Sequence, residues 1–386
     1  MNYTRHIEKN LENHFNTYKQ AIVLLGARQT GKTTILKRIF SDATYLLVDN
    51  EQTKNILETY DINTYLQVLG GSKQIIIDEL HLLSDPGRAV KIIYDQMTNV
   101  QLIVTGSSAL HIKNKSSESM AGRKIEYRLF PLTFSEYLVQ KEIDTELNYT
   151  ILENAIFSKQ NPARLFSPSD LVSRTLVYGL YPEQINIPNP RNYLLELADS
   201  AIFKDIVELN LIDNRSKAKE LLKLLAYQIG NLISYSEIGN RLSLDRRTVE
   251  KYITIFEQSY ILFRVYPYSK KARDEIGKAP KIYFYDLGLR NAIIDNFDTS
   301  ELRPDMGAMF ENFIIAELAK TISYQQLDYK LNYWRLKSGS EVDIVLSNAS
   351  DLYGFEVKLK NGQTSVAFTN RYPHAKTHLI TKDNFY

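Results

Sequence analysis

The chain of 386 residues has no cysteine, which excludes disulfide bonds and thiolate metal sites. It has no apolar run long enough to span a membrane, and its first residues lack the apolar core of a signal peptide. The 47 basic and 45 acidic residues leave a formal net charge of only +2, so any case for nucleic-acid binding must be local. These absences favour a cytoplasmic protein without membrane contact, of roughly two to four domains for this length.

A glycine-rich loop stands between a predicted strand and a predicted helix. The apolar run Ile22–Leu25 predicts a buried strand, and residues 26–33 after it have the form G-x-x-x-x-G-K-T. Glycines let backbone N–H groups approach a phosphate closely, Lys32 can reach the β- and γ-phosphates, and the Thr33 hydroxyl can bind Mg²⁺. A chance glycine-rich turn is the alternative. We expect an ATP site whose contacts are Gly26, Ala27, Arg28, Gln29, Thr30, Gly31, Lys32, Thr33 and Thr34.

A second apolar run, residues 74–77, ends in the acids Asp78 and Glu79. Its continuous apolar character fits a parallel strand that is buried on both faces. We expect Asp78 to hold Mg²⁺ and Glu79 to orient the attacking water. A third run, residues 102–105, ends in hydroxyl groups that either sense the γ-phosphate or cap the strand: Thr105, Ser107 and Ser108.

Arg123 follows a polar segment and is a candidate for a third role at the same site. A guanidinium at this point can reach a γ-phosphate in the same chain or in a neighbouring subunit, and the second case requires a homo-oligomer. A surface arginine is the alternative reading.

The order of the elements predicts an α/β fold. Strands expected at 22–25, 44–48, 75–78, 102–105 and 125–129 alternate with helices, which is typical of a parallel sheet covered on both faces. A single helix is expected over residues 1–20. We expect an ATPase core over 1–139 and a helical lid or connector over 140–215.

Residues 216–279 predict a winged helix-turn-helix. Four apolar residues recur at helical spacing and predict one buried stripe: Val249, Tyr252, Ile253 and Phe256. Three basic residues fall off that stripe and are expected to contact DNA phosphates: Arg246, Arg247 and Lys251. The following segment adds positive charge, with Lys270, Lys271 and Arg273 expected to help. The alternative is a packing module that uses the same fold for protein contacts.

Residues 280–386 predict a further mixed α/β domain with a cluster of acids. Asp343 lies in one expected strand, and Glu356 can meet it across a hairpin. Two carboxylates that converge can bind Mg²⁺ or Mn²⁺, and Lys358 next to them can stabilise a phosphate in the transition state. The alternative is a salt-bridged pair of strands.

The chain resembles the prokaryotic ATP-binding family that joins an AAA-type P-loop ATPase to a winged helix and a restriction-endonuclease-like domain. The resemblance rests on stretches in the family's order: 26–33, 75–79, 105–108, 122–123, 131–137, 179–183, 280–289, 310–312, 341–343 and 356–358. It implies that Asp343, Glu356 and Lys358 are the acid, E and K of a PD-(D/E)XK nuclease pattern, with Glu311 as the preceding acid and a further metal ligand. The family's glutamine after the second acidic strand is His81 here.

Three functions compete at this point. The first is an ATPase whose nucleotide state controls a DNA-contacting C-terminal half. The second is a metal-dependent DNA nuclease gated by ATP, which requires Asp343, Glu356 and Lys358 to converge. The third is a non-enzymatic regulator that binds proteins, which predicts no affinity for DNA even at low salt.

Overall fold

The computed structural model describes residues 3–97, 99–106, 120–157, 169–208, 212–269, 279–300 and 302–386. The chain forms two compact units. The first comprises Met1–Pro131, Phe203–Leu211 and Gln258–Tyr260, and the second comprises Leu132–Ile202, Ile212–Glu257 and Ile261–Tyr386. Within the described ranges, no helix is long and apolar enough to cross a membrane. The expected division into four segments stays a prediction.

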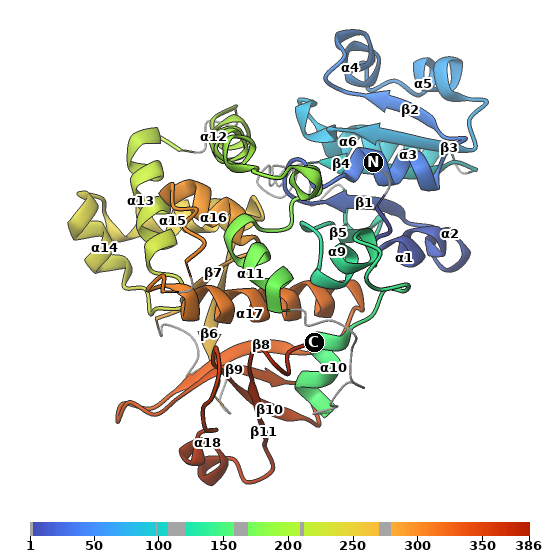
Figure 1. Ribbon diagram of the computed structural model, residues 1–386. Helices are drawn as coiled ribbons and strands as arrows, with labels where there is room; N and C mark the ends of the chain where they lie inside the picture. Colours follow the sequence, from blue (N-terminus) through green and yellow to red (C-terminus); the bar gives the residue numbers. More distant parts are fainter. Residues whose placement is uncertain are drawn as a thin grey trace. The chain divides into compact units, whose positions relative to one another are not determined.

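The first unit is built on a parallel five-stranded sheet of order β2-β3-β4-β1-β5 (Figure 1). Its strands are β1 Ala21–Leu25, β2 Thr44–Leu47, β3 Gln74–Asp78, β4 Gln101–Gly106 and β5 Lys124–Arg128. All of β1 and nearly all of β3 are buried, as their continuous apolar runs predict. The parallel sheet that the alternating pattern predicts is confirmed, and it brings the carboxyl ends of the strands to one edge.

The helices that accompany this sheet are short. They are α1 Glu8–Glu12, α2 His14–Thr17, α3 Lys32–Ile39, α4 Glu51–Glu58, α5 Ile62–Leu69, the 3₁₀ turn η1 Leu80–Leu82 and α6 Pro86–Gln96. The single helix expected over residues 1–20 is wrong. The chain breaks at Asn13, and His14 turns inward, where its ring contacts the Tyr127 hydroxyl at 2.9 Å and the Gln20 carbonyl at 2.7 Å.

The second unit contains a mixed six-stranded sheet of order β11-β10-β9-β8-β6-β7. Its strands are β6 Leu262–Pro267, β7 Lys281–Phe284, β8 Lys330–Arg335, β9 Glu341–Ser347, β10 Leu352–Val357 and β11 Lys376–Ile380. The hairpin formed by β6 and β7 joins the rest through parallel pairing of β6 with β8. The expected boundary at residue 280 therefore falls inside one continuous sheet, because β7 pairs with β6 of the preceding segment.

The remaining helices follow the first unit's sheet in the chain. They are α9 Phe134–Gln140, α10 Thr150–Phe157, α11 Ser169–Tyr178, η2 Glu183–Asn186, α12 Arg191–Glu208, α13 Arg215–Tyr227, α14 Tyr235–Leu242, α15 Arg246–Gln258, α16 Leu287–Ile294, α17 Met306–Tyr324 and α18 Val366–Arg371. In Figure 1 the long helix α17 runs between the sheet and the helices α11 and α16. Its buried face places acidic and basic side chains inside the unit.

Helices α14 and α15 are joined by a tight turn, and the winged helix-turn-helix expected here stays a prediction. Ser243 ends α14 in the left-handed conformation, with φ at 54°. A Cβ on Gly239 would lie 2.5 Å from the carbonyl oxygen of Leu244, so only glycine fits there. The predicted apolar stripe of α15 is confirmed, since Val249, Tyr252, Ile253 and Phe256 are each no more than 1% exposed.

Candidate nucleotide site

The glycine-rich loop joins the end of β1 to the start of α3. Gly31 precedes the helix with φ at +95°, and Gln29 is also left-handed, at φ 59°. A Cβ on Gly26 would lie 2.1 Å from the carbonyl oxygen of Leu129, so the loop needs glycine to pass this backbone. The strand, loop and helix that the motif requires are all present, and the N-terminus of α3 begins where a phosphate would bind.

The Lys32 side chain turns back over its own loop. Its buried ammonium donates hydrogen bonds of 2.9 Å to the carbonyl oxygens of Gly26 and Ala27. The Lys32 ammonium and the backbone N–H groups of the loop are together the kind of hydrogen-bond donors that bind a polyphosphate.

Asp78 is the last residue of β3, and its carboxylate accepts hydrogen bonds from three hydroxyl groups. Its Oδ2 accepts from Thr33 at 2.6 Å and from Tyr45 at 2.5 Å, and its Oδ1 accepts from Thr105. Burial raises the pKa of this carboxyl, but the hydrogen bonds from the three hydroxyls outweigh it, so the pKa lies below its usual value. An ionised carboxylate beside a threonine hydroxyl is an oxygen pair that fits Mg²⁺.

Glu79 follows in a strained backbone conformation, with φ at 57°. Its N–H donates to the Asp78 side chain at 3.2 Å and to the Thr105 hydroxyl at 3.1 Å. Its carboxylate lies 3.2 Å from Nδ1 of His81, the residue that stands where the resembling family has glutamine. The Asp78 carboxylate thus contacts three hydroxyl groups, whereas the Glu79 carboxylate lies beside His81.

Two residues that hold this site were not predicted from the sequence. Tyr45 reaches Asp78 from the neighbouring strand β2, and Arg5 reaches the loop from the start of the chain. The apolar and aromatic run of β2 indicates a strand but not which side chain meets the acid. For Arg5 the sequence offers no signal, because its contacts lie 25 and 125 residues away.

Arg123 is held within the first unit by Asp95. Its guanidinium makes two hydrogen bonds to that carboxylate, of 2.8 and 2.9 Å, and this pairing lowers the pKa of Asp95. The expected contact of Arg123 with a γ-phosphate stays a prediction. Ser107 and Ser108 lie outside the described residues.

Asp343 and Glu356 meet in the C-terminal sheet around one ammonium. Lys358 Nζ lies 2.9 Å from Asp343 and 3.2 Å from Glu356, and Asp343 also accepts from the backbone N–H of Val357 at 2.8 Å. Burial and then the charge of Asp343 raise the pKa of Glu356 to about 7. The side chains of Asp343 on β9 and Glu356 on β10 therefore lie on the same face of this antiparallel pair of strands, as a hairpin predicts.

Glu311 has different partners. It accepts a 2.5 Å hydrogen bond from the Tyr283 hydroxyl, and its carboxylate lies 3.5 Å from the buried ammonium of Lys281. The same ammonium is 2.5 Å from Glu341. Among the described residues, no three acidic, histidine or cysteine side chains are placed to hold a metal ion. Lys281 therefore pairs with Glu311 and Glu341, and Lys358 pairs with the other two acids, while the metal site expected from Glu311, Asp343 and Glu356 stays a prediction.

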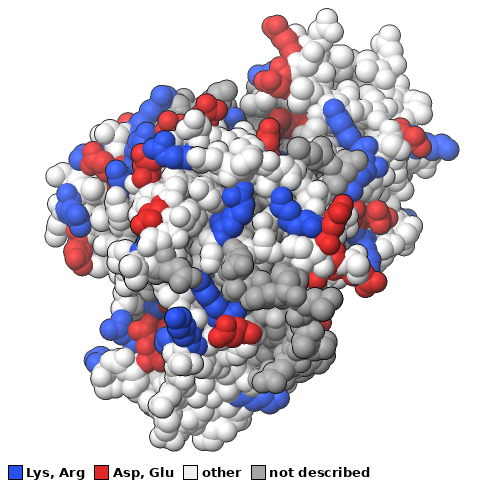
Figure 2. All heavy atoms as spheres, viewed as in Figure 1, with Lys and Arg blue, Asp and Glu red and all other residues white. Residues whose placement is uncertain are grey.

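The basic residues of α15 differ in their surroundings. Arg246 and Arg247 are exposed at the first turn, whereas Lys251 forms an ion pair of 3.0 Å with Asp213. The other expected contacts, Lys270, Lys271 and Arg273, lie outside the described residues. Figure 2 shows basic and acidic side chains interspersed on the face that it draws, in keeping with the small net charge.

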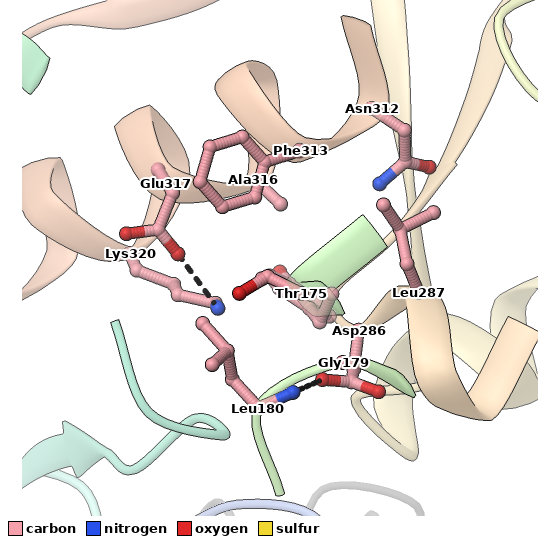
Figure 3. Close-up of a pocket in the computed structure, with 11 residues that line it drawn as sticks. Thr175, Gly179, Leu180, Asp286, Leu287, Asn312, Phe313, Ala316, Glu317 and Lys320 are labelled. Atoms are coloured by element: carbon pink, nitrogen blue, oxygen red, sulfur yellow. Dashed lines mark hydrogen bonds and ion pairs between the residues drawn. The ribbon is translucent and has the colours of Figure 1, made fainter. Parts of the chain in front are cut away.

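A buried ionic cluster lies near a small pocket of the second unit (Figure 3). Glu317 and Lys320, neighbours on α17, pair at 3.0 Å with both side chains 3% exposed. Close by, Asp286 accepts the backbone N–H of Leu180 at 2.6 Å, and a Cβ on Gly179 would collide with it at 2.1 Å. Two of the stretches that carry the family resemblance, 179–183 and 280–289, are therefore in contact through Asp286, Gly179 and Leu180.

Three family matches divide the chain. Residues 18–138 match an AAA domain, residues 169–300 match a domain of unknown function (DUF8612), and residues 306–382 match a second one (DUF4143). The uncharacterized protein MJ1637 of Methanocaldococcus jannaschii is 27% identical over 344 residues, which are 80% of this chain and 71% of that protein. The uncharacterized protein Rv2008c of Mycobacterium tuberculosis is 22% identical over 87% of this chain and 70% of its own length.

Among solved structures, the Walker-type ATPase PABY2304 of Pyrococcus abyssi is 16% identical, with a TM-score of 0.42 over 74% of this chain and 94% of that one. The signal-transduction ATPase PH0952 of Pyrococcus horikoshii is 12% identical, with a TM-score of 0.31 over 81% and 45%. Residues 18–138 are thus similar to an AAA domain, and the two regions that follow match domains of unknown function.

Proposed function

We propose that the protein binds ATP with Mg²⁺ and hydrolyses it to ADP and phosphate. The observation that carries this proposal is the contact between Thr33 and Asp78, which brings a hydroxyl and an ionised carboxylate together beside the phosphate loop. Thr33 and Asp78 would hold Mg²⁺, whose charge would neutralise the phosphate oxygens. Lys32 exchanges its two loop carbonyls for phosphate oxygens, and the backbone N–H groups of residues 26–34 enclose the phosphates.

In this proposal Glu79 orients the attacking water. Its backbone N–H donates hydrogen bonds to Asp78 and Thr105, and its carboxylate lies 3.2 Å from Nδ1 of His81, which supports this role. The test is binding of a fluorescent ATP analogue to the full chain. Lys32→Ala should abolish binding, while unchanged affinity in that variant would contradict the proposal.

The nucleotide state is proposed to control the C-terminal half through the segment Leu129–Phe134. At its start, the Leu129 N–H donates to Leu25 at 2.7 Å, next to the phosphate loop. At its end, Leu132 accepts from Lys320 at 3.0 Å and Phe134 donates to Glu317 at 2.8 Å. The segment thus continues from a residue next to the phosphate loop to two residues that form hydrogen bonds with α17.

DNA is the proposed partner of the C-terminal half. The exposed arginines Arg246 and Arg247 at the start of α15, and the tight turn before them, support phosphate contacts of a winged helix-turn-helix. ATP hydrolysis measured with and without duplex DNA tests this. Stimulation that falls steeply with salt supports it, and no DNA affinity at low salt favours the protein-binding regulator instead.

A metal-dependent nuclease is the second candidate, favoured by the shared position of Asp343, Glu356 and Lys358. The restriction-endonuclease-like identity of this region is part of that proposal. Incubation with DNA and Mn²⁺ should give cleavage that Asp343→Ala removes. The pairing of Glu311 with Lys281 weighs against a third carboxylate at the same ion.

A further inference from the structure

Arg5 lies before the AAA-type domain in the chain, yet it contacts the phosphate loop. The side chain is buried, with the residue 4% exposed. Its Nη1 donates to the carbonyl oxygen of Thr30 at 2.9 Å, and its Nη2 donates to that of Phe130 at 2.7 Å. One guanidinium thus joins the loop to the backbone that follows β5.

This contact acts on the part of the loop that must face a phosphate. Thr30 immediately precedes Gly31, whose left-handed conformation, with φ at +95°, sets the direction of the next N–H groups. Thr30 is held a second time by its hydroxyl, which donates to Ala27 at 2.9 Å. A planar guanidinium fixes two acceptors at a set spacing, which a lysine ammonium on a flexible stem does not. Arg5 also places a permanent positive charge behind the loop.

The segment that carries Arg5 is itself held to helix α3. Ile7 and Leu11 are each no more than 1% exposed, and the backbone N–H of Arg5 donates to Glu8. Glu8 pairs with Arg38 of α3 at 2.5 Å, and Arg38 donates to the Tyr3 carbonyl at 3.1 Å. Arg38 supports the same segment without touching the loop carbonyls.

We propose that Arg5 is a positioning residue of the ATP site, so that the segment 3–12 is part of the nucleotide-binding machinery; this inference rests on the proposed ATPase function. Arg5 touches no phosphate in this account. It acts through Thr30, whose carbonyl it holds so that the loop N–H groups keep the curvature that a phosphate requires.

The experiment compares Arg5→Lys and Arg5→Met with the control Arg38→Met in the full chain. Both Arg5 variants should raise the Kd of a fluorescent ATP analogue and the KM for ATP about tenfold or more, with kcat within about twofold, because uniform binding is lost. Arg38→Met should raise both constants clearly less than either Arg5 variant, because it loosens the segment but leaves the Thr30 carbonyl held. Equal effects of all three variants, or unchanged Kd in folded Arg5 variants, overturn the proposal.

A second measurement uses the wild-type chain and covers the case in which Arg5 variants do not fold. Addition of the ATP analogue with Mg²⁺ should slow amide hydrogen exchange in residues 3–8 together with residues 30–33. Slower exchange in the loop alone overturns the role of Arg5. Lys32→Ala separates the two claims: if it binds the analogue as wild type does, the ATP site itself is wrong, whereas loss of binding there leaves the Arg5 result to decide the inference.

Discussion

The Thr33 hydroxyl donates a 2.6 Å hydrogen bond to Oδ2 of Asp78, a residue 45 positions later in the chain. Thr33 lies in the first turn of α3, which follows β1 and the phosphate loop, and Asp78 ends β3; the strands β1 and β3 flank β4 in the sheet. Carboxyl ends of parallel strands meet at one edge, and ligands bind there in open α/β sheets. Substitutions at this contact therefore test the proposed ATP site directly.

Thr33→Ala should weaken Mg²⁺-dependent binding of ATP about tenfold or more, since it removes a proposed ligand and one of the three hydroxyls on Asp78. Thr34→Ala is the matched control, because Thr34 is exposed and would contribute only its backbone N–H. Titrations with Mg²⁺ and with EDTA measure the difference. Identical Mg²⁺ dependence in both variants would remove Thr33 from the site.

Lys320→Met should lower the free energy of unfolding by about 3 kcal/mol, because it leaves the buried Glu317 without its partner. Burial already raises the pKa of Glu317, which shows how poorly its ionised form is solvated there. The double variant Glu317→Gln with Lys320→Met should recover part of the loss in urea unfolding. A double variant as unstable as the sum of the single ones would mean that the pair does not interact.

The fold of the first unit could be predicted because β1, β3 and β4 contain continuous apolar runs and the phosphate loop has a fixed spacing. The same holds for the buried stripe of α15. The long-range polar contacts could not be predicted. Nothing in the local sequence shows that Lys281 lies between Glu311 and Glu341, or that β6 joins β8, because these contacts depend on the folded sheet.

The break at Asn13 has a similar cause. Ile7, Leu11 and Phe15 have the spacing of one helix. The helix is nevertheless interrupted at Asn13, where the next side chain, His14, is buried against Tyr127. The convergence of Asp343 with Glu356 could be expected from the hairpin, whereas the separate partners of Glu311 could not. The sequence shows which charged side chains are present, whereas the folded structure determines which of them form ion pairs.

Glu356 should make stability depend on pH. Its pKa is raised in the folded state from 4.5 to about 7, first by burial. A raised carboxyl pKa favours folding at low pH, so the free energy of unfolding should fall as pH rises between these two values. Glu356→Gln should flatten that fall in urea unfolding. Lys358→Met should steepen it, because the ammonium opposes the shift; a wild-type slope in Glu356→Gln would contradict the assignment.

Arg246→Ala combined with Arg247→Ala should weaken DNA binding and lower the slope of log K against log salt by about 2, because two phosphate contacts are lost. Lys251→Ala should change less, since Lys251 is paired with Asp213. Lys217→Ala on α13, where Lys217 pairs with Glu220, is the control for a general loss of positive charge. Fluorescence anisotropy at several salt concentrations gives the slopes, and equal slopes for all variants would exclude α15 from the contact.

We propose that ATP is hydrolysed at the end of β3, with Glu79 orienting the attacking water. Single-turnover hydrolysis of ATP with Mg²⁺ by wild type and Glu79→Gln tests it most directly, with analogue binding measured on the same samples. Glu79→Gln should bind ATP as tightly as wild type and hydrolyse it at least about a hundredfold more slowly. Wild-type turnover in Glu79→Gln, or no hydrolysis by the wild-type chain, would contradict it.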